Sequence, residues 1–301
     1  MSQVFRVNYA LVASGMVLAL SVSAQAGLQR TFVSTTGDDA NTSASCAASA
    51  PCRTFAAALS VTNPGGEIVV LTSGGYGPAT ISQPVVITAI GVNASISTVT
   101  SGANGLTINT GGNVTLIGLN LHGEAMGHDG ILVQQAGLLR IYNTLIENFT
   151  NDGLDFQVSG SLTINDSEIN DNNGIGVVVN NASAKAFVRN TSFDNNSVAL
   201  DIIAGQANVV DSSAENNSGG GFTAVGTGSL SLSHDRLLFN GLALETTGSA
   251  ALYFANCLIS SNTMAYFVGS GSTMAGTSPG TSLLSPGQTT SGTLSSPIAV
   301  Q

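Results

Sequence analysis

Two aspartates in the middle of the chain are spaced in a way that suits glycosidic chemistry. Asp155 and Asp201 each lie between two apolar residues of a short alternating segment, and Gly176 takes that place in the segment between them. If these segments stack as neighbouring strands about 4.8 Å apart, the two carboxylates lie about 9.6 Å apart. Inverting glycosidases use separations of about 6.5 to 9.5 Å. The alternative is a pair of solvated surface acids.

Asp194 and Glu215 form a second acidic pair. Each precedes a recurring asparagine by two residues, and we place them in one outward row with Glu147 and Asn170. On adjacent strands their backbones would lie about 5 Å apart. Like charges at that distance raise one pKa or bind a hard cation such as Ca²⁺. The alternative is a hydrated edge with mobile side chains.

The segment "HGEAMGHD" is the least repetitive stretch of the central region, and we expect its loop to bind a ligand. It contains His122, Glu124, His128 and Asp129, and Asp152 follows one repeat later. The two histidines lack a recognised zinc-ligand spacing, so no metal site is predicted here. The alternative is a loop with two incidental imidazoles.

These candidate residues belong to a repeat of about 23 residues. A small residue followed by an apolar-x-apolar pattern starts at positions 105, 130, 153, 174, 199, 221, 241 and 265. This spacing is within the range of about 20 to 50 residues that is typical of stacked repeats. A second pattern, apolar-x-apolar-x-x-small-x-apolar-x-x-Asn, fills the rest of each unit. Its five copies end at Asn172, Asn196, Asn217, Asn240 and Asn262.

Each repeat therefore holds two or three strands that are too short to bury their apolar faces alone. Stacking the repeats closes a continuous core and pairs each backbone with the coils above and below. Helical repeats are excluded because no i, i+3, i+4, i+7 stripe is present. A propeller blade needs about 40 residues. The sequence predicts an all-β parallel solenoid with about 23 residues per coil.

The five recurring asparagines are predicted to be structural. Their amides can hydrogen-bond to one another and to the turn backbone, forming an asparagine ladder, and asparagine tolerates the left-handed conformation of a tight bend. Cys257 occupies the inward small-residue position that Ser167, Thr191 and Ser212 fill elsewhere. We expect a buried thiol that packs rather than reacts.

Coils of this length, with an asparagine ladder and stacked aliphatic residues, resemble the single-stranded right-handed parallel β-helix of the pectin-lyase-like superfamily. The resemblance covers about residues 32–267. The segments "TGDDAN", "PCRTFAAALS" and "GGEIVVL" resemble the entry cap of bacterial secreted members. In such a cap Pro51 would precede a short helix, roughly residues 53–59, that covers the open end of the first coil.

The superfamily includes pectate lyases, polygalacturonases, pectin methylesterases, alginate epimerases, phage tailspikes and adhesins, so the fold does not assign an activity. The polygalacturonase set N-T-D, D-D, G-H-G and R-I-K is not present as a set, and D-P-H is absent. This favours a glycan-binding or surface protein without turnover. The alternative is a polysaccharide lyase or glycoside hydrolase acting on an acidic or neutral glycan, and whether the chain is an enzyme stays open.

The N-terminal segment indicates export. Arg6, an apolar run over residues 9–22 and the site Ala24-Gln25-Ala26 are typical of a secretory signal peptide. About fourteen apolar residues are fewer than the roughly 20 that cross a bilayer. We expect a secreted or periplasmic protein with no membrane anchor after cleavage. The predicted organisation is a signal peptide (1–26), an N-terminal cap (27–66), a parallel β-helix (67–268), and a C-terminal cap strand with a Ser/Thr/Gly/Pro-rich tail (269–301).

Charge and cysteine usage agree with this compartment. The formal net charge is −10 and no basic cluster offsets it, which argues against nucleic acid as a partner. Polysaccharide is the partner that the family resemblance implies. No resident cofactor is expected apart from the Ca²⁺ considered above. Cys46 and Cys52 in "CAASAPC" suit a local disulfide, with two unpaired thiols as the alternative.

Overall fold

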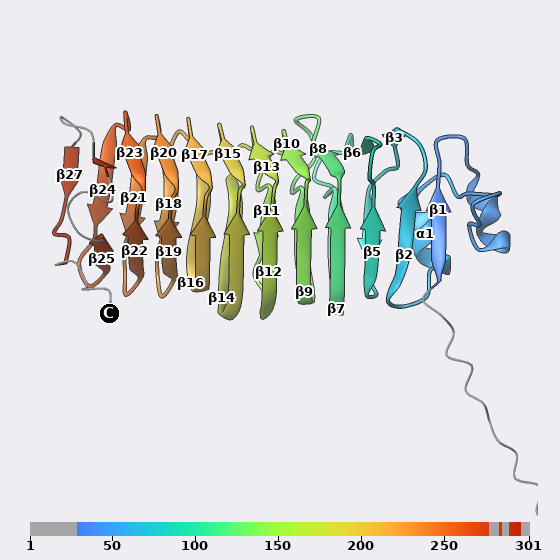
Figure 1. Ribbon diagram of the computed structural model, residues 1–301, viewed down its shortest axis with the longest axis horizontal. Coiled ribbons are helices and arrows are strands. Elements are labelled where there is room, and N and C mark those ends of the chain that lie inside the picture. Colours follow the sequence, from blue (N-terminus) through green and yellow to red (C-terminus); the bar gives the residue numbers. More distant parts are fainter. Residues whose placement is uncertain (1–28, 277–282, 285–288, 296–301) are drawn as a thin grey trace, which may run out of the picture.

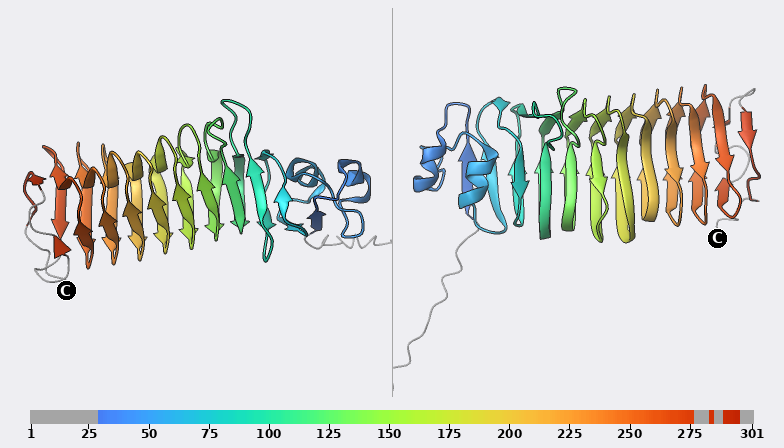
Figure 2. Two further views of the ribbon diagram at one scale, coloured as in Figure 1. Left: turned by 90° about the horizontal axis from the view of Figure 1, so that it is seen from above. Right: turned by 180° about the vertical axis from the view of Figure 1, so that it is seen from behind.

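The chain forms an elongated, all-parallel β-solenoid (Figures 1 and 2). The computed structural model describes residues 29–276, 283–284 and 289–295, so the predicted signal peptide lies outside the described residues. About 9 turns of about 23 residues stack along the long axis. The predicted fold class and coil length are confirmed.

Three segments make up each coil. In one representative coil, β12 (Gly160–Asn165) leads through a two-residue bend, turn 1, into β13 (Glu168–Asn170). A four-residue bend, turn 2, then leads into β14 (Ile175–Arg189). The long β14 combines a leading arm, which follows turn 2, with a trailing arm, which pairs with β12. The arms form the larger sheet and the β13-type strands form the smaller sheet.

The larger sheet has 17 strands and the smaller sheet has 10. The larger sheet comprises β1 (Arg30–Val33), β2 (Gly66–Val70), β4 (Ala79–Ile81), β5 (Val85–Thr88), β7 (Leu106–Ile117), β9 (Ile131–Tyr142), β11 (Leu154–Phe156), β12, β14, β16 (Val198–Val210), β18 (Gly220–Ala224), β19 (Ser229–Ser233), β21 (Leu242–Thr246), β22 (Ala251–Ala255), β24 (Met264–Val268), β25 (Thr273–Gly276) and β27 (Thr289–Ser291). The smaller sheet comprises β3 (Gly74–Gly75), β6 (Ala94–Ser97), β8 (Leu119–His122), β10 (Leu145–Glu147), β13, β15 (Ser192–Asp194), β17 (Ser213–Glu215), β20 (Arg236–Leu238), β23 (Leu258–Ser260) and β26 (Leu283–Leu284).

The core is a set of apolar columns that run along the solenoid axis. On the smaller sheet, Ile146, Ile169 and Phe193 pair in register on consecutive coils, and all three are fully buried. Strand alternation points these side chains inward and their neighbours outward. Each coil therefore covers the apolar face of the next, and a single coil could not do so alone.

A short helix covers the N-terminal end of the solenoid. The helix α1 (Phe55–Val61) begins two residues later than predicted because Thr54 caps it, accepting a hydrogen bond from the backbone N–H of Ala57 at 3.2 Å. Phe55 packs against Tyr76 with ring centroids 5.2 Å apart. A 3₁₀ helix, η1 (Asp39–Ala44), precedes it. No helix in the described part of the chain is long and apolar enough to span a membrane.

Both flanking segments take part in the solenoid. Cys46 and Cys52 are joined by a disulfide within the N-terminal cap, and β1 in the same segment pairs with β2. In the segment that was expected to hold one cap strand and a tail, β25, β26 and β27 each pair in parallel with the preceding coil. The stack therefore extends beyond residues 67–268 at both ends.

Strand register corrects two of the eight predicted repeat starts. The small residues in register are Gly176 and Ala243, each two positions after the residue that the sequence pattern selected. Both repeats contain two small residues two positions apart. A shift of two keeps every side chain on the same face of a strand, so alternation alone does not choose between them.

The five recurring asparagines are stacked and buried inside turn 2. The side-chain amide of each of the first four donates to the side-chain oxygen of the next, at 2.9 to 3.3 Å. The same oxygen also accepts the backbone N–H of the preceding asparagine, at 2.8 to 3.1 Å. Backbone groups at a buried bend need such partners because water does not reach them.

Replacing one asparagine of this stack should destabilise the whole solenoid. In the Asn196→Ala variant, the carbonyl of Ile169, which accepts from the Asn196 side chain at 2.8 Å, and the backbone N–H of Asn172, which donates to that side chain at 3.1 Å, lose these partners. We expect the free energy of unfolding to fall by about 2 to 4 kcal/mol. Urea unfolding measures it, with Asn208→Ala as control because Asn208 is exposed on β16. An equal loss in both variants would contradict a role for the stack.

Candidate functional site

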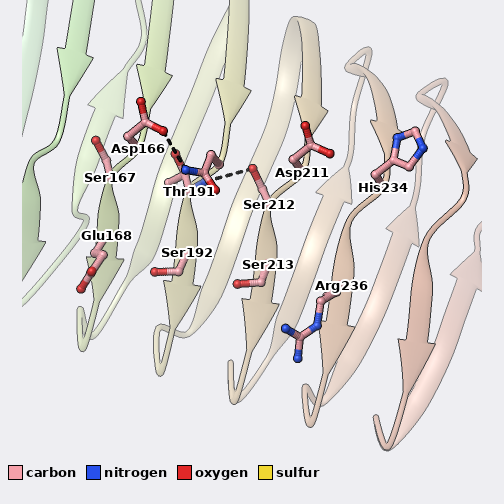
Figure 3. A pocket seen from close by; sticks show the side chains of 11 residues that line it. Asp166, Ser167, Glu168, Thr191, Ser192, Asp211, Ser212, Ser213, His234 and Arg236 are labelled. Carbon is pink, nitrogen blue, oxygen red and sulfur yellow. Dashed lines mark hydrogen bonds between the residues drawn. The ribbon is translucent and has the colours of Figure 1, made fainter.

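A polar groove runs along turn 1, where the two sheets meet (Figure 3). Its volume is about 430 Å³. Four consecutive coils contribute to it, mainly through the first residue of turn 1, the buried small residue after it and the first residue of the smaller-sheet strand. We call it the corner groove; it is lined by Asp166, Ser167, Glu168, Asn190, Thr191, Ser192, Asp211, Ser212, Ser213, His234 and Arg236.

The corner groove continues beyond these residues. A second hollow of about 280 Å³ toward the N-terminal coils shares Asp166 and Glu168 with it. A third, of about 480 Å³, shares Asp166, Asn190 and Asp211. Because these hollows share walls, the three adjoin one another along turn 1, and we call them together the channel.

The bend itself explains why polar residues line the groove. The first residue of turn 1 has a left-handed backbone, with φ between 47° and 62° on six consecutive coils. Asparagine and aspartate tolerate this conformation better than most residues. The Asn190 side-chain amide donates to Asp166 at 2.7 Å, so the row is also held together by hydrogen bonds. The six residues are Asn143, Asp166, Asn190, Asp211, His234 and Asn256.

Several groove side chains keep their hydrogen-bonding capacity free. Among the described residues, the side chains of Glu168, Ser192 and Ser213 take part in no hydrogen bond with the rest of the chain. At one end, the Arg236 guanidinium lies 3.4 Å from the Glu215 carboxylate. The middle of the groove therefore offers unused hydroxyl and carboxylate groups.

A buried stack of small polar residues forms the floor. Ser167 Oγ accepts the backbone N–H of Thr144 at 3.2 Å, and Ser212 Oγ accepts that of Thr191 at the same distance. Cys257 occupies this stack and is 2% exposed, as predicted. Burial raises the pKa of its thiol to about 11, which keeps it protonated.

Asp235 is the one carboxylate in this floor among the described residues. It is 1% exposed, and its two oxygens accept backbone N–H groups of Ser212 at 2.8 Å and Ser233 at 2.9 Å. Burial raises the pKa of Asp235 to about 7, although these two hydrogen bonds lower it and the nearby charge of Asp211 raises it further.

Asp155 and Asp201 lie two rungs apart on the leading arm, as predicted. The residue between them is Val178, not Gly176, and Val178 is only 4% exposed. The predicted gap between the two carboxylates is therefore wrong, because the repeat start in this coil was placed two residues too early. A valine side chain occupies the space that a bound substrate and water would need.

Both carboxylates of this row are held by the protein. Asp155 Oδ2 accepts a hydrogen bond from Gln157 at 2.9 Å, and Asp201 Oδ1 accepts one from the Thr223 hydroxyl at 2.6 Å. Burial raises the pKa of both groups above the ordinary value for aspartate, and these hydrogen bonds oppose the shift.

Asp194 and Glu215 occupy adjacent rungs of the smaller sheet, as predicted. Each has a partner within the protein: Asn216 donates to Asp194 at 2.9 Å, and Arg236 reaches Glu215 at 3.4 Å. Within the described residues, no group of three or more histidine, cysteine, aspartate or glutamate side chains is arranged to hold a metal ion. Binding of Ca²⁺ to this pair stays a prediction without further support.

The four residues of the predicted loop site divide into two separate groups. His122 lies on the smaller sheet, where its Nδ1 accepts the backbone N–H of Glu124 at 3.0 Å and its Nε2 lies 3.9 Å from Glu147. His128 and Asp129 lie at the end of turn 2, just before β9, with His128 Nδ1 3.0 Å from Asp129 Oδ2. The loop does not bring these two groups together into one ligand site.

Asp152 belongs with the second group and was not among the predicted site residues. Its backbone N–H donates to Asp129 Oδ1 at 3.2 Å, and its own Oδ1 accepts the backbone N–H of Ile175 at 2.7 Å. Burial raises the pKa of Asp152 to about 6, and the charges of Asp129 and Asp155 add to the shift. The signal in the sequence was an aspartate at a position where the next coils carry Ile175 and Val198.

The coil geometry, the two parallel sheets and the stacked polar turns define a parallel β-helix protein. The family model described as "Right handed beta helix region" matches residues 60–213, and the chain belongs to this family. The expected similarity to pectin-lyase-like folds is confirmed. No curated protein sequence matches the chain.

Two solved structures have a similar fold. The crystal structure of pectate lyase Pel9A aligns over 85% of this chain and 79% of its own, with 15% identity and a TM-score of 0.56. The structure of XylC in complex with xylose aligns over 83% of this chain and 69% of its own, with 10% identity and a TM-score of 0.64. At such low identity the similarity extends to the fold alone.

The buried carboxylate in the groove floor should make stability depend on pH. Because the pKa of Asp235 is raised on folding, the folded state keeps a proton that the unfolded state releases, so stability falls as pH rises from about 4 to about 7. Asp235→Ser restores the serine used in other coils. At pH 8 we expect it to raise the free energy of unfolding by about 2 to 4 kcal/mol relative to the native chain.

Urea unfolding at pH 5 and pH 8 measures this effect. Glu168→Gln is the matched control, because it removes an exposed carboxylate from the same groove. If Asp235→Ser and Glu168→Gln change stability equally at both pH values, the buried carboxylate is not the cause.

Proposed function

We propose that this protein binds a linear, uncharged polysaccharide along the corner groove. The observation that carries the proposal is the repetition of the groove: the same three positions recur on three consecutive coils, and two of them recur on a fourth. Coils repeat about every 4.8 Å along the solenoid axis, so four of them span about 14 Å between the first and last. A polymer with a short repeat unit can make equivalent contacts on successive coils.

The side chains of the groove suit the hydroxyl groups of sugars. Each sugar hydroxyl can both donate and accept a hydrogen bond, and Ser192, Ser213 and Glu168 have unused capacity. The chain has no tryptophan and aromatic residues make up 5% of it. Binding is therefore carried by hydrogen bonds distributed along the channel, with several weak contacts adding up.

The charge of the groove favours a neutral polymer. Asp166, Glu168 and Asp211 line it, and Arg236 at one end already pairs with Glu215. With a formal net charge of −10 for the chain, a polyuronate or a nucleic acid would meet repulsion along most of the channel. An uncharged glycan avoids this cost.

Two further observations support a role in glycan recognition. Both proteins with a similar fold are linked to carbohydrates: one is a pectate lyase, and the other was solved in complex with xylose. The N-terminal segment has the pattern of a secretory signal peptide. We therefore place the protein outside the cytoplasm, in the periplasm or the medium, where it would meet polysaccharide.

A bulky side chain in the middle of the groove should block binding. Ser192→Leu replaces a free hydroxyl with a branched apolar side chain on β15, and we expect affinity for a soluble neutral glycan such as arabinoxylan or glucomannan to fall about tenfold or more. Ser231→Leu is the matched control, since Ser231 lies on an outward position of β19 outside the groove. Isothermal titration calorimetry measures both.

Three outcomes would contradict the proposal. One is that the native protein binds neither arabinoxylan nor glucomannan, which would favour a purely structural surface role. A second is equal affinity of the two leucine variants, which would place binding elsewhere. A third is tighter binding of polygalacturonate than of any neutral polymer.

A further inference from the structure

Three of the seven lysine and arginine residues lie on one face of the larger sheet, although they come from separate coils. Arg140 lies on β9, Lys185 and Arg189 lie on β14, and β12 pairs with both strands and lies between them (Figure 1). Strand alternation points all three outward, because their neighbours on each strand are buried. We call the outward side of the trailing arms of β9, β12 and β14 the cationic face.

The three cations are spread around a polar and aromatic centre. Arg140 and Phe187 are in register with Thr163 between them, so they stand two rungs, or about 9.6 Å, apart. Lys185 and Arg189 lie two residues to either side of Phe187 on the same strand, each about 6.6 Å away. Phe187 is 39% exposed. The charges thus form a triangle with sides of about 12 Å, which is too wide for one small anion.

No carboxylate shares this face with the cations. The outward positions of the trailing arms from β7 to β22 hold no aspartate or glutamate. Within the described residues, the side chains of Arg140 and Lys185 make no ion pair or hydrogen bond, and Arg189 approaches Asp211 of turn 1 at 3.8 Å. Two of the three cations therefore have no counter-charge within their own chain.

The smaller sheet carries the opposite charge on the same coils. Each of four consecutive strands, β10, β13, β15 and β17, presents one outward carboxylate and no cation. In order along the sheet these carboxylates belong to Glu147, Glu168, Asp194 and Glu215. We call the outward side of these four strands the acidic face. Because β10 follows β9 and β15 follows β14 in the chain, the two faces lie at the same height along the solenoid axis.

We propose that the cationic face binds the acidic face of a second copy of this chain. Two copies that lie side by side and parallel, with no offset along the axis, place the cations of one opposite the carboxylates of the other. With a formal net charge of −10, most other surfaces of two copies repel each other, so few alternative contacts compete. Screening over about 8 Å at physiological salt removes most of the long-range repulsion.

The contact is head-to-tail. The two faces belong to different sheets of the same coils and are separated by turn 1. One contact therefore uses the cationic face of one copy and the acidic face of its neighbour. Each pair keeps one unused face of each kind, to which further copies can add. The assembly is a ring where the rotation between copies closes, and a row where it does not.

The dimensions of the cationic face indicate a weak contact. The distance from β9 to β16 is about 14 Å, and a trailing arm of six residues is about 20 Å long. The face therefore has a flat area of about 300 Å², which is less than half of the roughly 800 Å² per partner in a stable complex. We expect association to depend on protein concentration and on individual charges.

The acidic face borders the corner groove, because Glu168 belongs to both. A docked copy and a glycan in the groove would therefore exclude each other. Self-association does not require that the groove binds glycan, and it is measured without glycan. Failure of self-association would leave the proposed glycan binding untouched, and the reverse also holds.

Sedimentation velocity of the protein at concentrations up to about 0.1 mM, in about 0.15 M salt, measures the assembly. We expect the native chain to form dimers and larger species as its concentration rises. Lys185→Glu and Glu168→Lys should each weaken association about tenfold or more, because each places like charges across the contact. Arg30→Glu is the matched control, since it makes the same change of charge on an exposed residue of β1 outside both faces.

Mixing the two variants separates a docking contact from a folding defect. An equimolar mixture of Lys185→Glu and Glu168→Lys should associate about as well as the native chain, because the two reversed charges then meet each other. Thermal unfolding should show that both variants fold. The proposal would be overturned by a native chain that stays monomeric at about 0.1 mM, by native association of Lys185→Glu, by an equal loss in Arg30→Glu, or by no gain on mixing.

Discussion

Parallel backbone pairing between successive coils is the constraint on which every other feature depends. The pairing repeats the chain at a fixed spacing along one axis, so a residue type that suits one rung meets its own kind on the next. Apolar residues are buried by this stacking, as in the column formed by Ile146, Ile169 and Phe193. Polar residues must bond to each other or to the backbone. The stacked asparagines in turn 2 and the small hydroxyl residues in turn 1 do so.

The same constraint explains where polar surface accumulates. The first residue of turn 1 has a left-handed backbone conformation, and this position is mostly asparagine or aspartate. Their side chains project along one edge and line the corner groove. A feature that began as a requirement of the backbone thus supplies a continuous row of hydrogen-bonding groups, which a ligand can use without any change to the fold.

The capping helix was expected from the family resemblance. The sequence pattern was sufficient for the repeat, the coil length and the position of Cys257, because each depends on periodicity or local chemistry. It failed at Gly176, since a shift of two residues leaves the alternating pattern intact and only strand pairing distinguishes the two registers. That error placed a gap where Val178 lies. The groove was missed because its walls come from turns of different coils, and no short segment contains it.

Asp152 was named beside the predicted loop but was not chosen as a site residue, for a related reason. Read alone, it is one of many aspartates near a turn; read in register, it stands in a column that becomes aliphatic at Ile175 and Val198. Asp129 stands one rung before it, so two adjacent carboxylates are a local departure from a column that is aliphatic on the following coils. Such departures mark the places where a solenoid carries something besides its own stability.

The hydrogen bonds between asparagine side chains in the turn 2 stack all run in one direction, from the amide of one coil to the side-chain oxygen of the coil that follows it. Because every coil presents the same acceptor behind and the same donor ahead, a coil could be inserted or removed without creating a mismatch at either junction. The number of coils can therefore change while the contacts between neighbouring coils stay the same. Duplication of one repeat would lengthen the channel by one increment and leave its chemistry unchanged, so selection for longer ligands would need no new architecture.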